Sequence, residues 1–118
     1  DKVDVVVPVP LHKKKLMQRG YNQSEFIAIG VAKVLNCEMN TDLLKRMEHS
    51  ESQTKKSKFE RWENVGSAFT LTDASQYRGK HILLVDDVVT TGATLEACCK
   101  KLKEIEGVKL SVGTLASA

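Results

Sequence analysis

The sequence predicts an α/β domain in which helices flank a parallel β-sheet, and three observations support this fold class. Residues 82–85 form a continuous apolar run, as expected for a strand that is buried on both faces of a parallel sheet. A tight Thr/Gly turn follows this run and opens directly into a helical pattern of apolar residues. Apolar runs at residues 3–9 and 108–115 predict further strands. The 118 residues are enough for one domain, which we expect to span residues 1–118.

The N-terminal third predicts a strand, a basic loop and a helix. The β-branched run at residues 3–9 is expected to form the first strand, and residues 11–25 a basic loop. Asn22 and Glu25 resemble a capping box, which predicts a helix that ends near Asn36. The helix would bury a stripe made of Phe26, Ile27, Val31, Val34 and Leu35. Arg19 precedes a glycine turn beside the helix start, which favours a binding role.

The middle of the chain has no clear periodicity. Residues 41–44 predict a short strand, and residues 68–71 predict a hairpin or an edge strand. Residues 45–64 are mostly polar, and a long polar loop inside a compact domain is most often a lid or a binding loop. Arg61 is then a candidate phosphate clamp. A charged surface helix over residues 52–64 is the alternative, and the two interpretations are compatible.

Two carboxylates and a Thr/Gly turn separate the predicted central strand from its helix. Asp86 and Asp87 come at the carboxyl end of the strand, where acidic residues of dinucleotide folds accept hydrogen bonds from sugar hydroxyls. Gly92 lets the backbone approach a phosphate closely, and the hydroxyls of Thr90, Thr91 and Thr94 add hydrogen bonds. Backbone N–H groups and the positive end of the helix dipole converge there. The sequence therefore predicts a cradle for a ribose 5-phosphate; it lacks the G-x-x-x-x-G-K-[ST] pattern of a P-loop.

The helix after this turn is expected to carry one apolar stripe and to end at a glycine. The stripe consists of Leu95, Cys98, Cys99, Leu102 and Ile105. Gly107 stands where a C-cap is expected.

Composition and charge are those of an ordinary soluble protein, with 42% hydrophobic and 28% charged residues and a formal charge of +3. The basic residues form two groups, either of which suits a polyanion such as pyrophosphate or a nucleic acid. The first contains Lys13, Lys14, Lys15 and Arg19; the second contains Lys45, Arg46, Lys55, Lys56, Lys58 and Arg61. The lysines of the first group also fit a solvated loop. No signal peptide or membrane span is apparent, so we expect a cytoplasmic protein without membrane insertion.

Residues 84–95, Leu-Val-Asp-Asp-Val-Val-Thr-Thr-Gly-Ala-Thr-Leu, closely resemble the phosphoribosyl pyrophosphate (PRPP) signature of the type I phosphoribosyltransferases. The resemblance implies a parallel sheet of four or five strands flanked by helices, with a flexible hood loop between residues 45 and 64. It also implies that Asp86 and Asp87 hold the ribose hydroxyls of PRPP. The 5-phosphate would be bound by Thr90, Thr91, Gly92, Ala93 and Thr94.

Two further segments resemble the ComF family of competence-associated phosphoribosyltransferase-like proteins. The first is Val-Pro-Val-Pro-Leu-His at residues 7–12 with Arg-Gly-Tyr-Asn-Gln-Ser-Glu at residues 19–25. The second is the pattern formed by Arg46, Gln53, Arg61, Asn64 and Ala68-Phe69. ComF proteins usually carry an N-terminal cysteine-rich zinc-binding segment. This sequence lacks such a segment, either because it was cut away or because it was never present, so we expect no zinc here. The first strand begins almost at residue 1, so we expect that further sequence precedes it.

The resemblance implies a reaction in which a nucleophile displaces pyrophosphate from PRPP, with Mg²⁺ bridging the diphosphate and ribose oxygens. Lys13, Lys14, Lys15 and Arg19 would bind the pyrophosphate, and no protein side chain is assigned as a metal ligand. Lys15, Arg19 and Arg61 would stabilise the departing pyrophosphate and count as the catalytic residues. The acceptor cannot be named from the sequence, and a homodimer is left open.

Two alternatives to this transferase remain at this point. One is a regulatory module that binds PRPP or a nucleotide without catalysis. The other is an accessory protein of DNA uptake that contacts single-stranded DNA and proteins of the competence machinery. Binding of PRPP without pyrophosphate release would mark the first, and a steep salt dependence of DNA affinity the second.

Overall fold

A computed structural model describes residues 2–11, 13–47, 69–89 and 92–117 of the chain. The elements are β1 (Val5–Pro8), α1 (Lys13–Arg19), α2 (Gln23–Leu35), β2 (Glu38–Met39), β3 (Leu44–Arg46), β4 (Phe69–Leu71), the 3₁₀ helix η3 (Ala74–Tyr77), β5 (His81–Val89), α4 (Ala93–Leu102) and β6 (Lys109–Ser117). Most of the predicted hood loop, together with Arg61, Thr90 and Thr91, lies outside the described residues.

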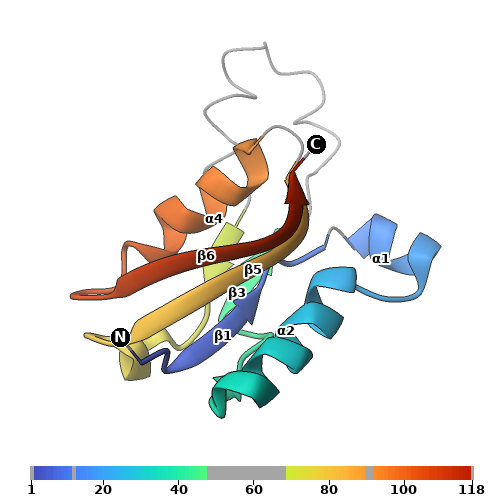
Figure 1. The fold of residues 1–118 in the computed structure, drawn as a ribbon. Coiled ribbons are helices and arrows are strands. Elements are labelled where there is room, and N and C mark those ends of the chain that lie inside the picture. Colours follow the sequence, from blue (N-terminus) through green and yellow to red (C-terminus); the bar gives the residue numbers. More distant parts are fainter. Residues whose placement is uncertain (1, 12, 48–68, 90–91, 118) are drawn as a thin grey trace.

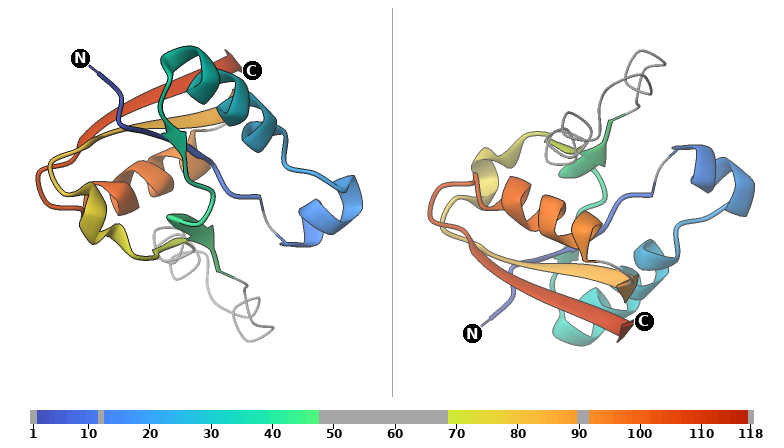
Figure 2. Two further views of the ribbon diagram at one scale, coloured as in Figure 1. Left: turned by 90° about the horizontal axis from the view of Figure 1, so that it is seen from below. Right: turned by 90° about the horizontal axis from the view of Figure 1, so that it is seen from above.

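The main sheet has four parallel strands in the order β2-β1-β5-β6, which confirms the predicted fold class. Helix α2 covers one face of this sheet and α4 the other (Figures 1 and 2). Strands β3 and β4 form a separate antiparallel pair on the α4 side. Ile82 and Leu84 of β5 are fully buried on the α4 face and Val85 is buried on the α2 face, as the continuous apolar run predicts.

Helix α2 packs on the sheet through its smallest residues. Ser24, Ala28 and Ala32 recur every fourth position and are buried, with Ala28 and Ala32 in one apolar cluster with Val6 and Val85. The predicted apolar stripe is therefore wrong in part, since Phe26 is 59% exposed and Val34 is 85% exposed. Small side chains let the helix backbone approach the sheet closely. Ile27 and Val31 of the predicted stripe pack half-buried against the same cluster.

Two other expectations are corrected. The segment after β1 contains the short helix α1 instead of a loop only, consistent with the good helix formers in its sequence Lys-Lys-Lys-Leu-Met-Gln-Arg. Helix α4 ends at Leu102, so Gly107 is not its C-cap. Gly107 has a φ of +69° and lies in the turn before β6, where an added Cβ would sit 3.5 Å from the Cα of Gly79.

The connections leave the central strands in opposite directions. The chain passes from β1 through α2 to β2 on one side, and from β5 through α4 to β6 on the other. A crevice therefore opens beyond the carboxyl ends of β1 and β5, at the switch point where α/β proteins commonly bind ligands. None of the helices in the described part of the chain is long and apolar enough to cross a membrane.

Candidate functional site

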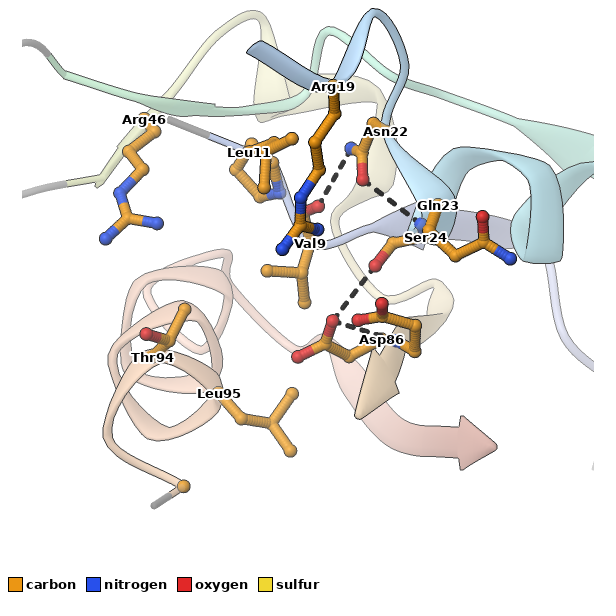
Figure 3. A pocket seen from close by; sticks show the side chains of 13 residues that line it. Val9, Leu11, Arg19, Asn22, Gln23, Ser24, Arg46, Asp86, Thr94 and Leu95 are labelled. Atoms are coloured by element: carbon orange, nitrogen blue, oxygen red, sulfur yellow. Dashed lines mark hydrogen bonds between the residues drawn. The ribbon is translucent and has the colours of Figure 1, made fainter. Parts of the chain in front are cut away.

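A pocket lies at this switch point. Its walls come from the segment after β1, the end of α1, the N-terminus of α2, the strand β3, the carboxyl-terminal half of β5 and the N-terminus of α4 (Figure 3). Six segments thus contribute to one site, and two of the contributions are helix N-termini, where backbone N–H groups favour anions.

Asn22 joins the start of α2 to the end of β1. It is the N-cap residue, and its side-chain oxygen accepts a hydrogen bond from the backbone N–H of Ser24 at 3.1 Å. Its side-chain nitrogen donates to the carbonyl oxygen of Val9 at 3.1 Å. The predicted helix start at Asn22 is confirmed, and the second bond holds the helix N-terminus beside the pocket.

Asp86 and Asp87 lie half-buried in the carboxyl-terminal half of β5, which continues past them to Val89. One carboxylate oxygen of Asp86, Oδ1, accepts a hydrogen bond from the hydroxyl of Ser24 at 2.9 Å. The backbone N–H of Asp87 donates to the same oxygen at 2.9 Å. Burial raises the pKa of the Asp86 carboxyl above its usual value, and the hydrogen bond from Ser24 opposes this rise.

Gly92 forms the N-terminal end of α4. It has a φ of +79°, a left-handed conformation that favours glycine, and it makes no side-chain capping bond. An added Cβ would meet no atom of the described residues within 4 Å, the chain neighbours of Gly92 aside, so these residues leave space in front of the helix. Ala93 begins the helix, and Thr94 and Leu95 follow it into the pocket wall. This is the arrangement expected of a phosphate cradle.

Two arginines from different elements enter the pocket. Arg19 ends α1 and Arg46 ends β3, and Figure 3 shows both guanidinium groups directed into the space above Asp86 and Thr94. The guanidinium carbon of Arg46 lies 5.3 Å from the centre of the Phe69 ring. In the described part of the chain, the buried Nε of Arg46 has no hydrogen-bond partner.

The structure brings together most of the predicted site residues that it describes. Arg19, Asp86, Asp87, Gly92 and Thr94 all line one pocket. Lys13, Lys14 and Lys15 begin α1, but their side chains, like Thr90, Thr91 and Arg61, lie outside the description.

Sequence reasoning gave no role to Arg46, Ser24 or Asn22 as pocket residues. Two signals had pointed to Arg46, which belongs to the second basic group and to the pattern that resembles the ComF family. Asn22 was assigned to a helix cap, and the signal for Ser24 was its place in the ComF-like segment at residues 19–25.

Comparison with known proteins agrees with this geometry. A family model described as "Phosphoribosyl transferase domain" matches residues 22–118. The chain is 31% identical to Competence protein F of Haemophilus influenzae, over 98% of this chain and 51% of that protein. It is 35% identical to Competence protein ComFC of Bacillus subtilis, over 88% of this chain and 40% of that protein. It is also 35% identical to DNA utilization protein YhgH of Escherichia coli, over 78% of this chain and 40% of that protein. The chain thus spans about half or less of the length of these relatives.

Similar solved structures include a purine phosphoribosyltransferase from Pyrococcus horikoshii, with a TM-score of 0.64 and 17% identity over 98% of this chain and 63% of that one. An adenine phosphoribosyltransferase from Saccharomyces cerevisiae has a TM-score of 0.61 and 12% identity over 100% of this chain and 57% of that one. These likenesses show the fold. The chain belongs to the phosphoribosyl transferase domain family, and its resemblance to the ComF competence proteins is confirmed.

Proposed function

We propose that this chain binds PRPP together with Mg²⁺ and transfers its phosphoribosyl group to a nucleophile with release of pyrophosphate. The observation that carries the proposal is the meeting of two carboxylates, an open helix N-terminus and two arginines at the switch point of the sheet. The names of the relatives favour a role in competence or DNA utilization. A cytoplasmic location, and nucleotide salvage as the other context, belong to the proposal.

The ribose 5-phosphate half of PRPP fits the β5–α4 side of the pocket. The backbone at Gly92 leaves room for a phosphate at the N-terminus of α4, where the hydroxyl of Thr94 lies close by. Asp86 and Asp87 precede this cradle on the same strand, and their carboxylates are acceptors for the 2- and 3-hydroxyls of ribose. Thr90, Thr91 and Ala93 complete the proposed 5-phosphate segment.

The pyrophosphate half fits the opposite side of the pocket, where Arg19 and Arg46 supply positive charge. Arginine binds phosphate oxygens through paired donors, and Arg46 is steadied against the Phe69 ring. Lys13, Lys14 and Lys15 on α1 and Arg61 are proposed to add further charge. In this assignment Arg46 joins the residues that stabilise the departing pyrophosphate.

Magnesium enters this proposal as part of the PRPP complex. Among the residues that the structure describes, no group of three His, Cys, Asp or Glu side chains is placed to hold a metal ion. The diphosphate and ribose oxygens of PRPP are the hard ligands that Mg²⁺ prefers, so the proposed ligand set lies mainly on the substrate. Bound there, Mg²⁺ would neutralise part of the charge on the leaving group.

The protein's contribution to the reaction is positioning and charge stabilisation. As the bond between the anomeric carbon and the pyrophosphate breaks, positive charge grows on the ribose ring and negative charge on the leaving oxygen. The carboxylates of Asp86 and Asp87 hold the ring hydroxyls in place, and Arg19 and Arg46 receive the negative charge. The nucleophile then attacks the anomeric carbon.

Calorimetric titration of PRPP with Mg²⁺ tests the proposal. We expect binding in the low micromolar range, roughly −8 kcal/mol, that is weaker without Mg²⁺ and lost in the Asp86→Asn, Asp87→Asn double variant. Release of pyrophosphate on addition of free bases or other nucleophiles would identify the acceptor. A folded wild-type chain that fails to bind PRPP would refute the proposal.

Two other functions are compatible with the same pocket and the same relatives. A non-catalytic PRPP- or nucleotide-binding module predicts the same binding without pyrophosphate release. A DNA-uptake accessory protein, favoured by the relatives' names, predicts binding to single-stranded DNA that weakens steeply with salt.

A further inference from the structure

Ser24 stands out among the residues that α2 packs against the sheet. It is 3% exposed and belongs to the same every-fourth-residue row as Ala28 and Ala32. Alanine would fill this position with a similar volume and a better helix propensity. Packing and helix formation therefore give no reason for a hydroxyl here, and a buried hydroxyl needs a hydrogen-bond partner.

The partner of this hydroxyl is the carboxylate of Asp86, which lies 62 positions further along the sequence. The hydroxyl and the backbone N–H of Asp87 both donate to Oδ1, each at 2.9 Å. Figure 3 shows the other carboxylate oxygen directed away from α2 and toward Leu95 on α4. One oxygen is thus held by the protein, and the other faces the pocket.

We propose that Ser24 is a positioning residue, which fixes the Asp86 carboxylate so that its second oxygen is presented to the ribose of the ligand. This inference rests on the proposed function for the identity of the ligand, but the contact itself does not. A carboxylate that is already held loses less rotational freedom when a sugar hydroxyl binds to it. The anchor comes from α2, so the cap at Asn22, which positions α2, also supports the site.

The hydrogen bond from Ser24 also affects the ionisation of Asp86, together with the charged groups around it. Asp87 on the same strand disfavours the charged form, Arg19 and Arg46 line the pocket from α1 and β3, and Cys98 of α4 is a buried neutral thiol. Burial raises the pKa of Asp86, and the Ser24 hydrogen bond lowers it. Removal of the hydroxyl is expected to raise the pKa further.

The test uses Ser24→Ala, with Ser24→Thr to restore a hydroxyl. Ser75→Ala is the matched control, because Ser75 also donates to a carboxylate, that of Asp73, but at an exposed site at 3.4 Å. The carboxyl carbon of Asp86 is followed by NMR in the ligand-free protein as the pH is changed, with Asp86→Asn to assign its signal. PRPP with Mg²⁺ is then titrated into each variant at several pH values.

Ser24→Ala is expected to raise the pKa of Asp86 and to weaken PRPP binding about tenfold, the effect of one hydrogen bond to a charged group. The loss should persist at a pH where Asp86 is fully ionised in both proteins, because orientation as well as charge is disturbed. Ser24→Thr should recover most of the wild-type behaviour, and Ser75→Ala should leave both the pKa of Asp86 and the affinity unchanged.

An unchanged pKa of Asp86 in Ser24→Ala would overturn the inference. If the wild type binds PRPP, an equal PRPP affinity of Ser24→Ala would overturn it as well. A raised pKa in a protein that does not bind PRPP would support the anchoring contact and refute the proposed function. The two failures are therefore distinguishable.

Discussion

Replacement of Gly92 by alanine should impair ligand binding far more than it impairs folding. Gly92 has a φ of +79°, and no atom of the residues that the structure describes lies within 4 Å of the position of its missing Cβ, its chain neighbours aside. The substitution therefore adds no clash, only the left-handed strain of about 1–2 kcal/mol. A less flexible unfolded chain offsets about 0.4–1 kcal/mol of that strain. A net loss of about 1 kcal/mol corresponds to a Tm that is lower by roughly 3–5 °C for a chain of this size.

Binding should suffer a larger loss because the new methyl group occupies the space through which a phosphate reaches the N-terminus of α4. Loss of one charge-assisted hydrogen bond, about 1.5–3 kcal/mol, corresponds to an affinity that is about 10- to 100-fold weaker. Gly79→Ala is a close control, since Gly79 has a φ of +70° and an equally open Cβ position outside the pocket. Calorimetry with PRPP and Mg²⁺, paired with thermal unfolding, measures both effects. Equal affinities of the two variants would refute the reasoning.

Three further predictions concern single side chains. Arg46→Lys should weaken PRPP binding about tenfold, because lysine lacks the paired donors and the stacking on Phe69, whereas Lys45→Met, at an exposed neighbouring position, should not. Asp86→Asn should raise the Tm of the ligand-free protein at neutral pH. Burial raises the pKa of Asp86 in the folded protein, so the ionised carboxylate opposes folding. The gain in Tm should shrink as the pH falls towards that pKa. Burial raises the pKa of the Cys98 thiol to about 12, so mass spectrometry should find Cys98 unmodified by iodoacetamide in the folded protein at neutral pH. The stability that the neutral Cys98 thiol contributes should be lost as the pH rises from the pKa of this thiol in the unfolded chain towards its pKa in the folded protein. Modification of Cys98 without unfolding, or an Asp86→Asn variant that is less stable than the wild type, would contradict these assignments.

The parts of the fold that could be predicted depend on interactions that are local in sequence. The central strand, the turn and α4 follow one another within residues 81–102. The apolar run, the glycine and the helical stripe therefore each predict the local structure of their own short segment. The parallel sheet and the acidic end of β5 follow from that segment alone. The N-cap at Asn22 was predictable for the same reason, because its partner Ser24 is two positions away.

The parts that could not be predicted depend on contacts between distant segments. Periodicity assigned the large apolar residues of α2 to its buried face, but a close helix–sheet approach requires the small residues Ser24, Ala28 and Ala32 there. Arg46 enters the pocket only because β3 pairs with β4 across 22 intervening residues, a pairing that no local pattern reveals. The hydrogen bond between Ser24 and Asp86 joins two helix–strand units and is invisible in either one.

The central claim is that PRPP occupies the pocket between the ends of β1 and β5. The most direct test is to follow the backbone amide signals of isotope-labelled protein by NMR as PRPP with Mg²⁺ is added. The account predicts that the signals of Ser24, Asp86, Asp87, Thr94 and Leu95 shift together and saturate at one affinity. Signals that move only on the outer face of α2, around Phe26 and Val34, or that do not move at all, would contradict it.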